Sequence, residues 1–180
     1  MKKEDIRIPD HYFSAFQAVD FDMLELAGYT NLLVDVDNTI ARRDSDEVEE
    51  KALRKILNLL DCNRGWKICL VSNIIFGKER EMRVRKIADS MGLPAITAKF
   101  FNRKPYPDPF LKGMKILESQ PENTAIIGDQ VFTDIIGGNR LGLLTVLIKP
   151  LGPDHWTTTL MGRRRKEGMI LREKGITIEG

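Results

Sequence analysis

Two aspartates, Asp35 and Asp37, follow directly after the apolar residues 32–34 in this 180-residue chain. A buried strand of a parallel sheet tolerates little charge, so acids at its carboxyl end mark the crevice in which open α/β sheets bind ligands. On a regular strand the two side chains would share a face and could engage one cation or one phosphoryl group. A bound divalent metal would relieve their mutual repulsion. The alternative is an ordinary acidic turn formed with Asn38 and Thr39.

The elements that must position these acids are strands and helices in alternation. The patterns predict strands over residues 32–34, 66–73, 95–98, 124–127 and 144–148, and helices over residues 22–27, 47–60, 78–91, 107–117 and 134–141. Asp46 could cap the helix that begins at residue 47. Such alternation indicates right-handed crossovers. We therefore expect an α/β, three-layer Rossmann-like fold, in which a central parallel five-stranded sheet carries helices on both faces.

Parallel strands bring their carboxyl ends to one edge of the sheet, so the side chains that follow different strands should meet there. The polar residues expected at this edge are Asp35, Asp37, Thr39, Ser72, Asn73, Lys104, Asp129 and Asp134. Taken singly, each has an ordinary explanation: Ser72 could close a strand, and Lys104 could be a solvent-exposed lysine beside a proline. Their joint occurrence in this order favours an assembled site.

Four segments in this order resemble the signatures of the haloacid dehalogenase (HAD) superfamily of phosphotransferases. They are DxDxT at residues 35–39, a strand-end serine at Ser72, a lysine at Lys104, and GDxxxxD at residues 128–134. The resemblance covers about residues 32–148. It implies a magnesium-dependent phosphomonoester hydrolase that acts through an aspartyl-phosphate intermediate.

Phosphoryl transfer needs a nucleophile, a proton donor for the leaving oxygen, and neutralisation of the phosphoryl oxygens. Asp35 is the candidate nucleophile, and Asp37 is the candidate acid and base. Hydrogen bonds and charge for the phosphoryl group would come from Asn38, Thr39, Ser72, Asn73 and Lys104. Magnesium would bind Asp35, Asp129 and the backbone carbonyl of Asp37. Asp134 would orient this metal shell, through water or by holding Lys104.

A receiver domain of two-component signalling uses similar residues on a parallel sheet. Its phospho-accepting Asp ends a middle strand, after an earlier acidic pair. Here the DxD segment comes first and Lys104 precedes the last acids, so the receiver order does not match.

The connections between the motifs are short. From Thr39 to Ser72, and from Asn73 to Lys104, there is room for little more than one helix with its loops, so we expect no large cap domain. An open site lacks a water-excluding lid and the selectivity that a lid provides. The substrate should therefore be bulky or presented on a surface.

The segments VDVDNTI, LVSN, KP and GDQVFTDIIGGNRLG, with a following strand that ends at Pro150, resemble one branch of the uncapped HAD phosphatases. This is the YqeG-type branch of subfamily IIIA, which is related to mitochondrial phosphatidylglycerophosphate phosphatase. The resemblance implies hydrolysis of the terminal phosphate of this anionic lipid. Two alternatives stay open: a phosphoprotein or another phosphorylated substrate, and a catalytically silent metal-binding interaction module.

Composition and charge suggest how the chain is organised. Hydrophobic and charged fractions of 42% and 30% are those of a soluble globular protein. We expect one domain with an N-terminal arm (1–30), a phosphatase core (31–150) and a basic extension (151–180). From Met161 onward, six Lys or Arg and three Glu give a net charge of +3, and a basic amphipathic helix is predicted over residues 157–174. The arm and the extension could pack on the core or contact an acidic bilayer.

The predicted location follows from what the sequence lacks. It contains two cysteines, and it shows neither a signal peptide nor an apolar run long enough to cross a membrane. These features predict a cytoplasmic protein, peripheral at most at the inner membrane surface. A net charge of +2 is too small to indicate a nucleic-acid partner, and the oligomeric state is left open.

Overall fold

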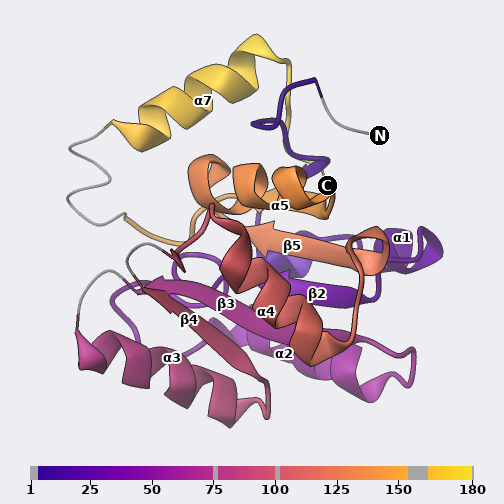
Figure 1. The fold of residues 1–180 in the computed structure, drawn as a ribbon, viewed down its shortest axis with the longest axis vertical. Coiled ribbons are helices and arrows are strands. Elements are labelled where there is room, and N and C mark those ends of the chain that lie inside the picture. Colours follow the sequence, from indigo (N-terminus) through magenta and orange to yellow (C-terminus); the bar gives the residue numbers. More distant parts are fainter. Residues whose placement is uncertain (1–3, 75–76, 100–101, 154–161, 180) are drawn as a thin grey trace.

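The computed structural model describes residues 4–74, 77–99, 102–153 and 162–179. Within them, six strands form one parallel sheet in the order β1-β6-β5-β2-β3-β4 (Figure 1). The strands are β1 (His11–Phe13), β2 (Asn31–Val34), β3 (Lys67–Ile74), β4 (Ala95–Lys99), β5 (Thr124–Gly128) and β6 (Leu144–Ile148). The prediction of five strands was wrong by one. The additional strand, β1, lies in the predicted N-terminal arm and pairs with β6 at the edge of the sheet.

Helices cover both faces of the sheet, as predicted (Figure 1). The α-helices are α1 (Phe21–Leu26), α2 (Glu50–Asp61), α3 (Lys78–Ser90), α4 (Pro107–Leu117), α5 (Ile136–Leu141) and α7 (Arg163–Glu173). Short 3₁₀ turns, η1 (Phe16–Ala18) and η3 (Pro121–Asn123), precede α1 and β5. Helices α1, α2 and α3 share one apolar cluster, and α4 lies in the cluster on the opposite face.

The central strand β2 shows why three layers form. Leu32 and Val34 pack into the cluster with α2 and α3, whereas Leu33 packs into the cluster with α4. All three side chains are fully buried. Because alternate residues of a strand point to opposite faces, a continuous apolar run has to be covered on both sides.

Two helix starts differ from the predictions. Helix α2 begins at Glu50 because the side chain of Glu49, rather than that of Asp46, accepts the hydrogen bond from the Ala52 N–H (2.9 Å). The helix predicted from Asp134 begins instead at Ile136, because Asp134 belongs to a π-helical turn, η4 (Val131–Ile135), that leads into α5. This turn lies directly after β5, so it brings Asp134 back to the edge of the sheet.

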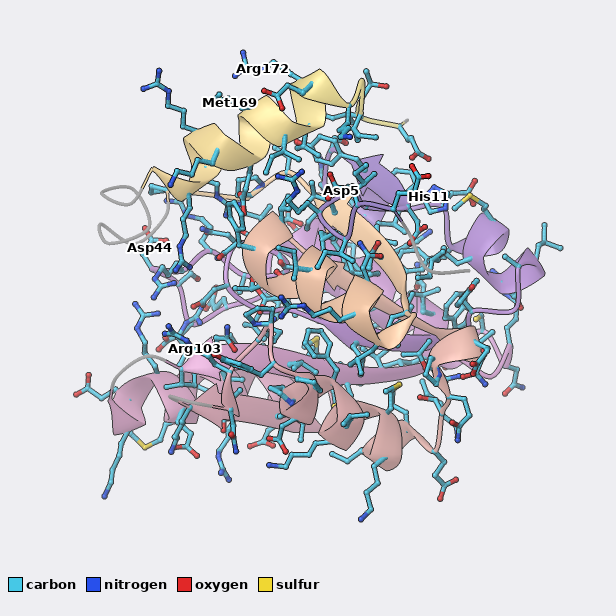
Figure 2. All side chains as sticks on the ribbon, turned by 45° about the horizontal axis from the view of Figure 1, so that its top comes forward. Asp5, His11, Asp44, Arg103, Met169 and Arg172 are labelled. Carbon is cyan, nitrogen blue, oxygen red and sulfur yellow. The ribbon has the colours of Figure 1, made fainter. Side chains whose placement is uncertain are left out.

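The segment that follows α7 contacts β1. Phe13 forms an isolated parallel β-bridge with Glu179, and the His11 ring lies 3.1 Å from the Glu179 carboxylate. Figure 2 shows Asp5 and His11 near the C-terminal end of α7, and Met169 and Arg172 on its outer side. The first residues of the predicted basic helix lie outside the described residues. No helix within the described ranges has the length and apolar character that a membrane crossing requires.

Candidate active site

The carboxyl ends of the three central strands carry the predicted polar residues. In the register of the sheet, Val34 of β2 lies beside Leu70 of β3 and Ile127 of β5. The residues just beyond these positions, Asp35 and Asp129, therefore end up side by side. All strands run in the same direction, so residues far apart in sequence meet at this edge.

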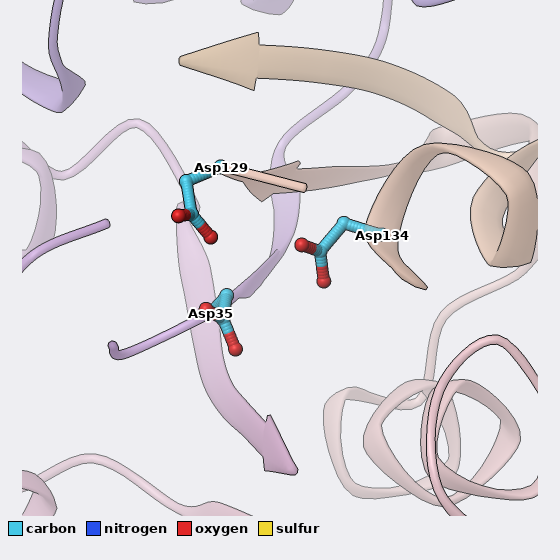
Figure 3. Close-up of side chains that lie close together, drawn as sticks. All are labelled: Asp35, Asp129 and Asp134. Carbon is cyan, nitrogen blue, oxygen red and sulfur yellow. The ribbon is translucent and has the colours of Figure 1, made fainter. Parts of the chain in front are cut away.

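Three buried carboxylates converge here (Figure 3). Asp35, Asp129 and Asp134 each offer one oxygen, and these oxygens lie within 4.8 Å of one another. Their residues are 6%, 1% and 1% exposed. Burial raises the pKa of the Asp35 carboxyl to about 7, against the opposing effect of the Lys104 ammonium. Burial also raises the pKa of Asp129.

This donor set fits a divalent cation. It consists of carboxylate oxygens, which are the ligands that hard cations prefer. Asp129 Oδ1 is buried and accepts no hydrogen bond from any described residue. A cation held by Asp35, Asp129 and Asp134 would satisfy this oxygen and reduce the repulsion among the three acids.

Lys104 extends into the same group and is 2% exposed. Its Nζ lies 2.6 Å from Asp35 Oδ1 and 2.6 Å from Asp134 Oδ1, and it donates to the Val71 carbonyl at 2.7 Å. Burial disfavours the ammonium, but the carboxylates of Asp134 and Asp35 outweigh this effect and raise the pKa of Lys104. The site therefore contains a fixed positive charge beside Asp35.

The backbone of Lys104 is held by Asn73, the last but one residue of β3. The Asn73 side chain accepts from the Lys104 N–H (2.8 Å) and donates to the Lys104 carbonyl (3.0 Å). Ser72 is 1% exposed and lines the same cavity as these two residues. The predicted phosphate ligand Asn73 thus orients Lys104 through its side chain.

The chain turns sharply after β2. The N–H groups of Thr39, Ile40 and Ala41 all donate to the Val36 carbonyl. Asn38 supports this turn with a left-handed backbone (φ 61°), and its side chain donates to the Pro153 carbonyl (3.3 Å). Because the strand ends at Val34, the alternation that would place the two DxD carboxylates on one face does not continue. The Thr39 hydroxyl lies 3.5 Å from Asp35 Oδ2.

Asp37 faces a cluster of three arginines and is not part of the acidic group. Its Oδ1 lies 2.6 Å from Arg83, and its Oδ2 lies 3.4 Å from Arg43 and 3.3 Å from Arg80. Its side chain is 13% exposed and lines the cavity above Asp35. These arginines were not among the residues predicted for the site. Arg80 and Arg83 are three residues apart on α3, a spacing common on solvated helix faces.

Gly128 is required by the close approach of Asp134. A Cβ atom at this position would lie 2.3 Å from Asp134 Cγ. The Asp134 carboxylate also accepts from the Gln130 N–H and the Thr133 hydroxyl, both at 3.2 Å. The glycine of the GDxxxxD segment therefore makes room for its last aspartate.

Helix α7 adds a further arginine, Arg164, which was not among the residues predicted for the site. The Arg164 guanidinium contacts both the carboxylate and the carbonyl oxygen of Asp129. It also pairs with Glu167 at 3.1 Å. Glu167 is 5% exposed, and burial raises its pKa. The run of arginines at residues 163–165 was the only local signal for this contact.

A cavity of about 630 Å³ opens above Asp35. Its lining contains five Lys or Arg and two Asp. The charged residues are Asp35, Asp37, Arg43, Arg103, Lys104, Arg163 and Lys166, and the others are Ser72, Asn73, Pro105, Gln130, Phe132 and Thr133. Its size is within the range of small-molecule sites, and its charge suits an anion.

Solved structures with the same fold include HAD phosphatases. A HAD phosphatase from Thermococcus onnurineus matches with a TM-score of 0.52 and 15% identity, over 74% of this chain and 98% of that one. The D,D-heptose 1.7-bisphosphate phosphatase from B. bronchiseptica, solved with magnesium and phosphate, matches with a TM-score of 0.54 and 15% identity, over 80% and 99%. At these identities the likeness shows the fold.

Sequence relatives are phosphatases. The probable phosphatase YqeG of Bacillus subtilis is 26% identical over 170 residues, which cover 93% of each chain. Phosphatidylglycerophosphate phosphatase 1, chloroplastic, of Chlamydomonas reinhardtii is 29% identical over 167 residues, 86% of this chain and 57% of that protein. The family model described as mitochondrial PGP phosphatase matches residues 1–151. The chain is thus a phosphatase of the HAD superfamily and belongs to the mitochondrial PGP phosphatase family.

Proposed function

We propose that this phosphatase depends on magnesium and hydrolyses the terminal phosphomonoester of phosphatidylglycerophosphate through an aspartyl-phosphate intermediate. The observation that carries the proposal is the buried pair of Asp35 and Lys104 beside two further carboxylates, at the floor of an open basic cavity. The family match over residues 1–151 supports the lipid substrate.

In the first step, the Asp35 carboxylate attacks phosphorus and the bond from phosphorus to the ester oxygen breaks. The leaving alkoxide takes a proton from Asp37. In the second step, water gives a proton back to Asp37 and attacks the acyl phosphate, the bond from phosphorus to Asp35 breaks, and inorganic phosphate leaves. Lys104 and Ser72 hold the phosphoryl oxygens in both steps.

Asp35, Asp129 and Asp134 would hold the magnesium ion, which would neutralise charge on the phosphoryl oxygens when bound. Asp134 already contacts Lys104, so it can orient both the lysine and the acidic group. The two oxygens of Asp37 are occupied by guanidinium groups. Its role as proton donor therefore requires a side-chain rotation that releases one oxygen toward the cavity.

The connections around the cavity favour a bulky substrate. In the described residues, the chain between β2 and β3 forms α2, and the chain between β3 and β4 forms α3, with no separate lobe over the strand ends. A head group at the end of a large lipid can enter a site of this kind. Peripheral contact with an anionic bilayer remains a prediction.

Phosphate release decides between this function and the alternatives. We would assay wild type with magnesium or EDTA on an aryl phosphate, on phosphatidylglycerophosphate in mixed micelles, and on phosphopeptide and phosphosugar panels. The expected result is magnesium-dependent hydrolysis with the highest kcat/KM for the lipid, and its loss in Asp35→Asn, which keeps the size of the side chain. Higher kcat/KM for a phosphopeptide would contradict the lipid substrate. A folded wild type inactive with excess magnesium on every substrate would favour the interaction module.

A further inference from the structure

Three of the basic residues that line the active-site cavity are Arg103, Arg163 and Lys166. Arg103 comes from the segment before α4, and Arg163 and Lys166 come from the first turn of α7. None of the three forms an ion pair with a described residue. By contrast, the cavity residues Lys104 and Arg43 are paired with Asp35 and Asp37. The mouth of the cavity therefore carries positive charge beyond what the reacting phosphate needs.

The three residues approach the cavity from separate parts of the chain. Figure 1 shows the first turn of α7 on the side of the molecule toward which β3 and β5 point. Arg103, labelled in Figure 2, is exposed. Arg163 and Lys166 are three residues apart and share one face of α7. An anion at the mouth would thus be contacted by two groups from one helix and one from a loop.

Helix α7 begins with an arrangement that is locally unfavourable. Its N-cap is Gly162, which has no side chain to cap the helix, and its first turn contains no acid. Residues 163–166 are all basic, although the N-terminus of a helix carries partial positive charge. Natural proteins depart from the local sequence preferences of helices and strands mainly at functional sites. A bound anion would offset this repulsion, because the cationic side chains and the partial positive charge of the helix N-terminus would both favour it.

We infer that Arg103, Arg163 and Lys166 bind a second phosphate group of the substrate, the phosphodiester that joins the head group to the diacylglycerol. This inference rests on the proposed function, which places the terminal phosphomonoester on Asp35 and Lys104. The two phosphates of such a head group are separated by one glycerol unit, and a cavity of about 630 Å³ can contain both. The enzyme then selects lipids with two phosphates over simple monoesters.

The test compares two substrates in solution. One is short-chain phosphatidylglycerophosphate below its critical micelle concentration, so that no bilayer contributes. The other is an aryl phosphate, which has no second phosphate. The variants are Arg103→Gln and the double variant Arg163→Gln/Lys166→Gln, with Arg165→Gln as the matched control on the same helix turn. Arg165 is exposed and does not line the cavity.

We expect the ratio of kcat/KM for the lipid to kcat/KM for the aryl phosphate to fall roughly 10-fold or more in each cavity variant, mainly through KM. The control should keep the wild-type ratio, and Arg163→Lys/Lys166→Arg should restore most of it. Equal losses on both substrates, or no loss on the lipid, would overturn the inference while leaving the proposed function intact. A wild type that hydrolyses the aryl phosphate but not the lipid would overturn both. Thermal unfolding of every variant checks that the fold is kept.

Discussion

Replacing Gly128 by alanine tests whether Asp134 needs the space that the glycine leaves. The new Cβ would lie 2.3 Å from Asp134 Cγ and 2.7 Å from Asp134 Cβ. The Cβ of Asp134 is attached to the backbone of η4, so rotation about χ1 cannot relieve both contacts. Either η4 shifts as a unit, or the Asp134 side chain leaves its place beside Lys104.

Both responses reduce stability. Insertion of a methyl group into a packed site costs about 1–3 kcal/mol. If the carboxylate leaves, Lys104 loses one of its two ion-pair contacts at 2.6 Å, and breaking a buried pair costs about 3–5 kcal/mol. These costs are alternatives rather than a sum, because a shift of η4 relieves the clash. We therefore expect Gly128→Ala to lower the free energy of unfolding by about 3 kcal/mol.

Urea unfolding measures this change, and kcat on an aryl phosphate measures the effect on Asp35 and Lys104. Gly168→Ala is the matched control, since the nearest atom to its new Cβ is 3.8 Å away. That control should be neutral or slightly stabilising, because alanine favours a helix interior more than glycine does. If the free energy of unfolding of Gly128→Ala is within about 0.5 kcal/mol of the wild-type value and kcat is kept, Asp134 does not need the space that the glycine leaves.

Three further predictions concern the same site. Because the pKa of Asp35 is raised from 3.8 to about 7 in the folded protein, the stability of metal-free protein should fall as pH rises from 4 to 7, by up to roughly 4 kcal/mol. Thermal unfolding in EDTA measures this, and Asp35→Asn should flatten the profile; an unchanged slope in that variant would argue against it. Asn73→Ala removes two hydrogen bonds to the Lys104 backbone, and we expect it to lower the free energy of unfolding by about 1–2 kcal/mol and to lower kcat. An unaltered kcat would show that these two hydrogen bonds are not needed for turnover. Arg164→Gln removes a guanidinium from Asp129, so calorimetry at pH 8 should find tighter magnesium binding, and weaker binding would contradict the expected competition.

Most of the fold could be predicted because its signals are local. The apolar run before Asp35 is buried on both faces. The helices between the strands are predicted by apolar residues at helical spacing and by the glycines that follow their last residues. The strand β1 was missed because three residues, His11–Phe13, are too few to show alternation. Their pairing depends on β6, more than 130 residues later.

Chemistry at strand ends could also be predicted in part. Asp35, Asp129 and Lys104 meet because parallel strands share one edge, and this follows from element order without any knowledge of contacts. The position of Asp37 could not be obtained in this way. The turn after Val34 changes the direction of the chain, and the pattern of residue types does not predict the new direction.

The sequence by itself therefore determined which strands carry acids at their ends, because strand burial and helix periodicity depend on neighbouring residues. Only the tertiary structure decided which charges neutralise those acids. Arg83 reaches Asp37 and Arg164 reaches Asp129 across 46 and 35 residues of sequence, respectively. Electrostatic pairing depends on distance in space rather than on separation along the chain, and 28 basic residues offer many partners that no local pattern distinguishes.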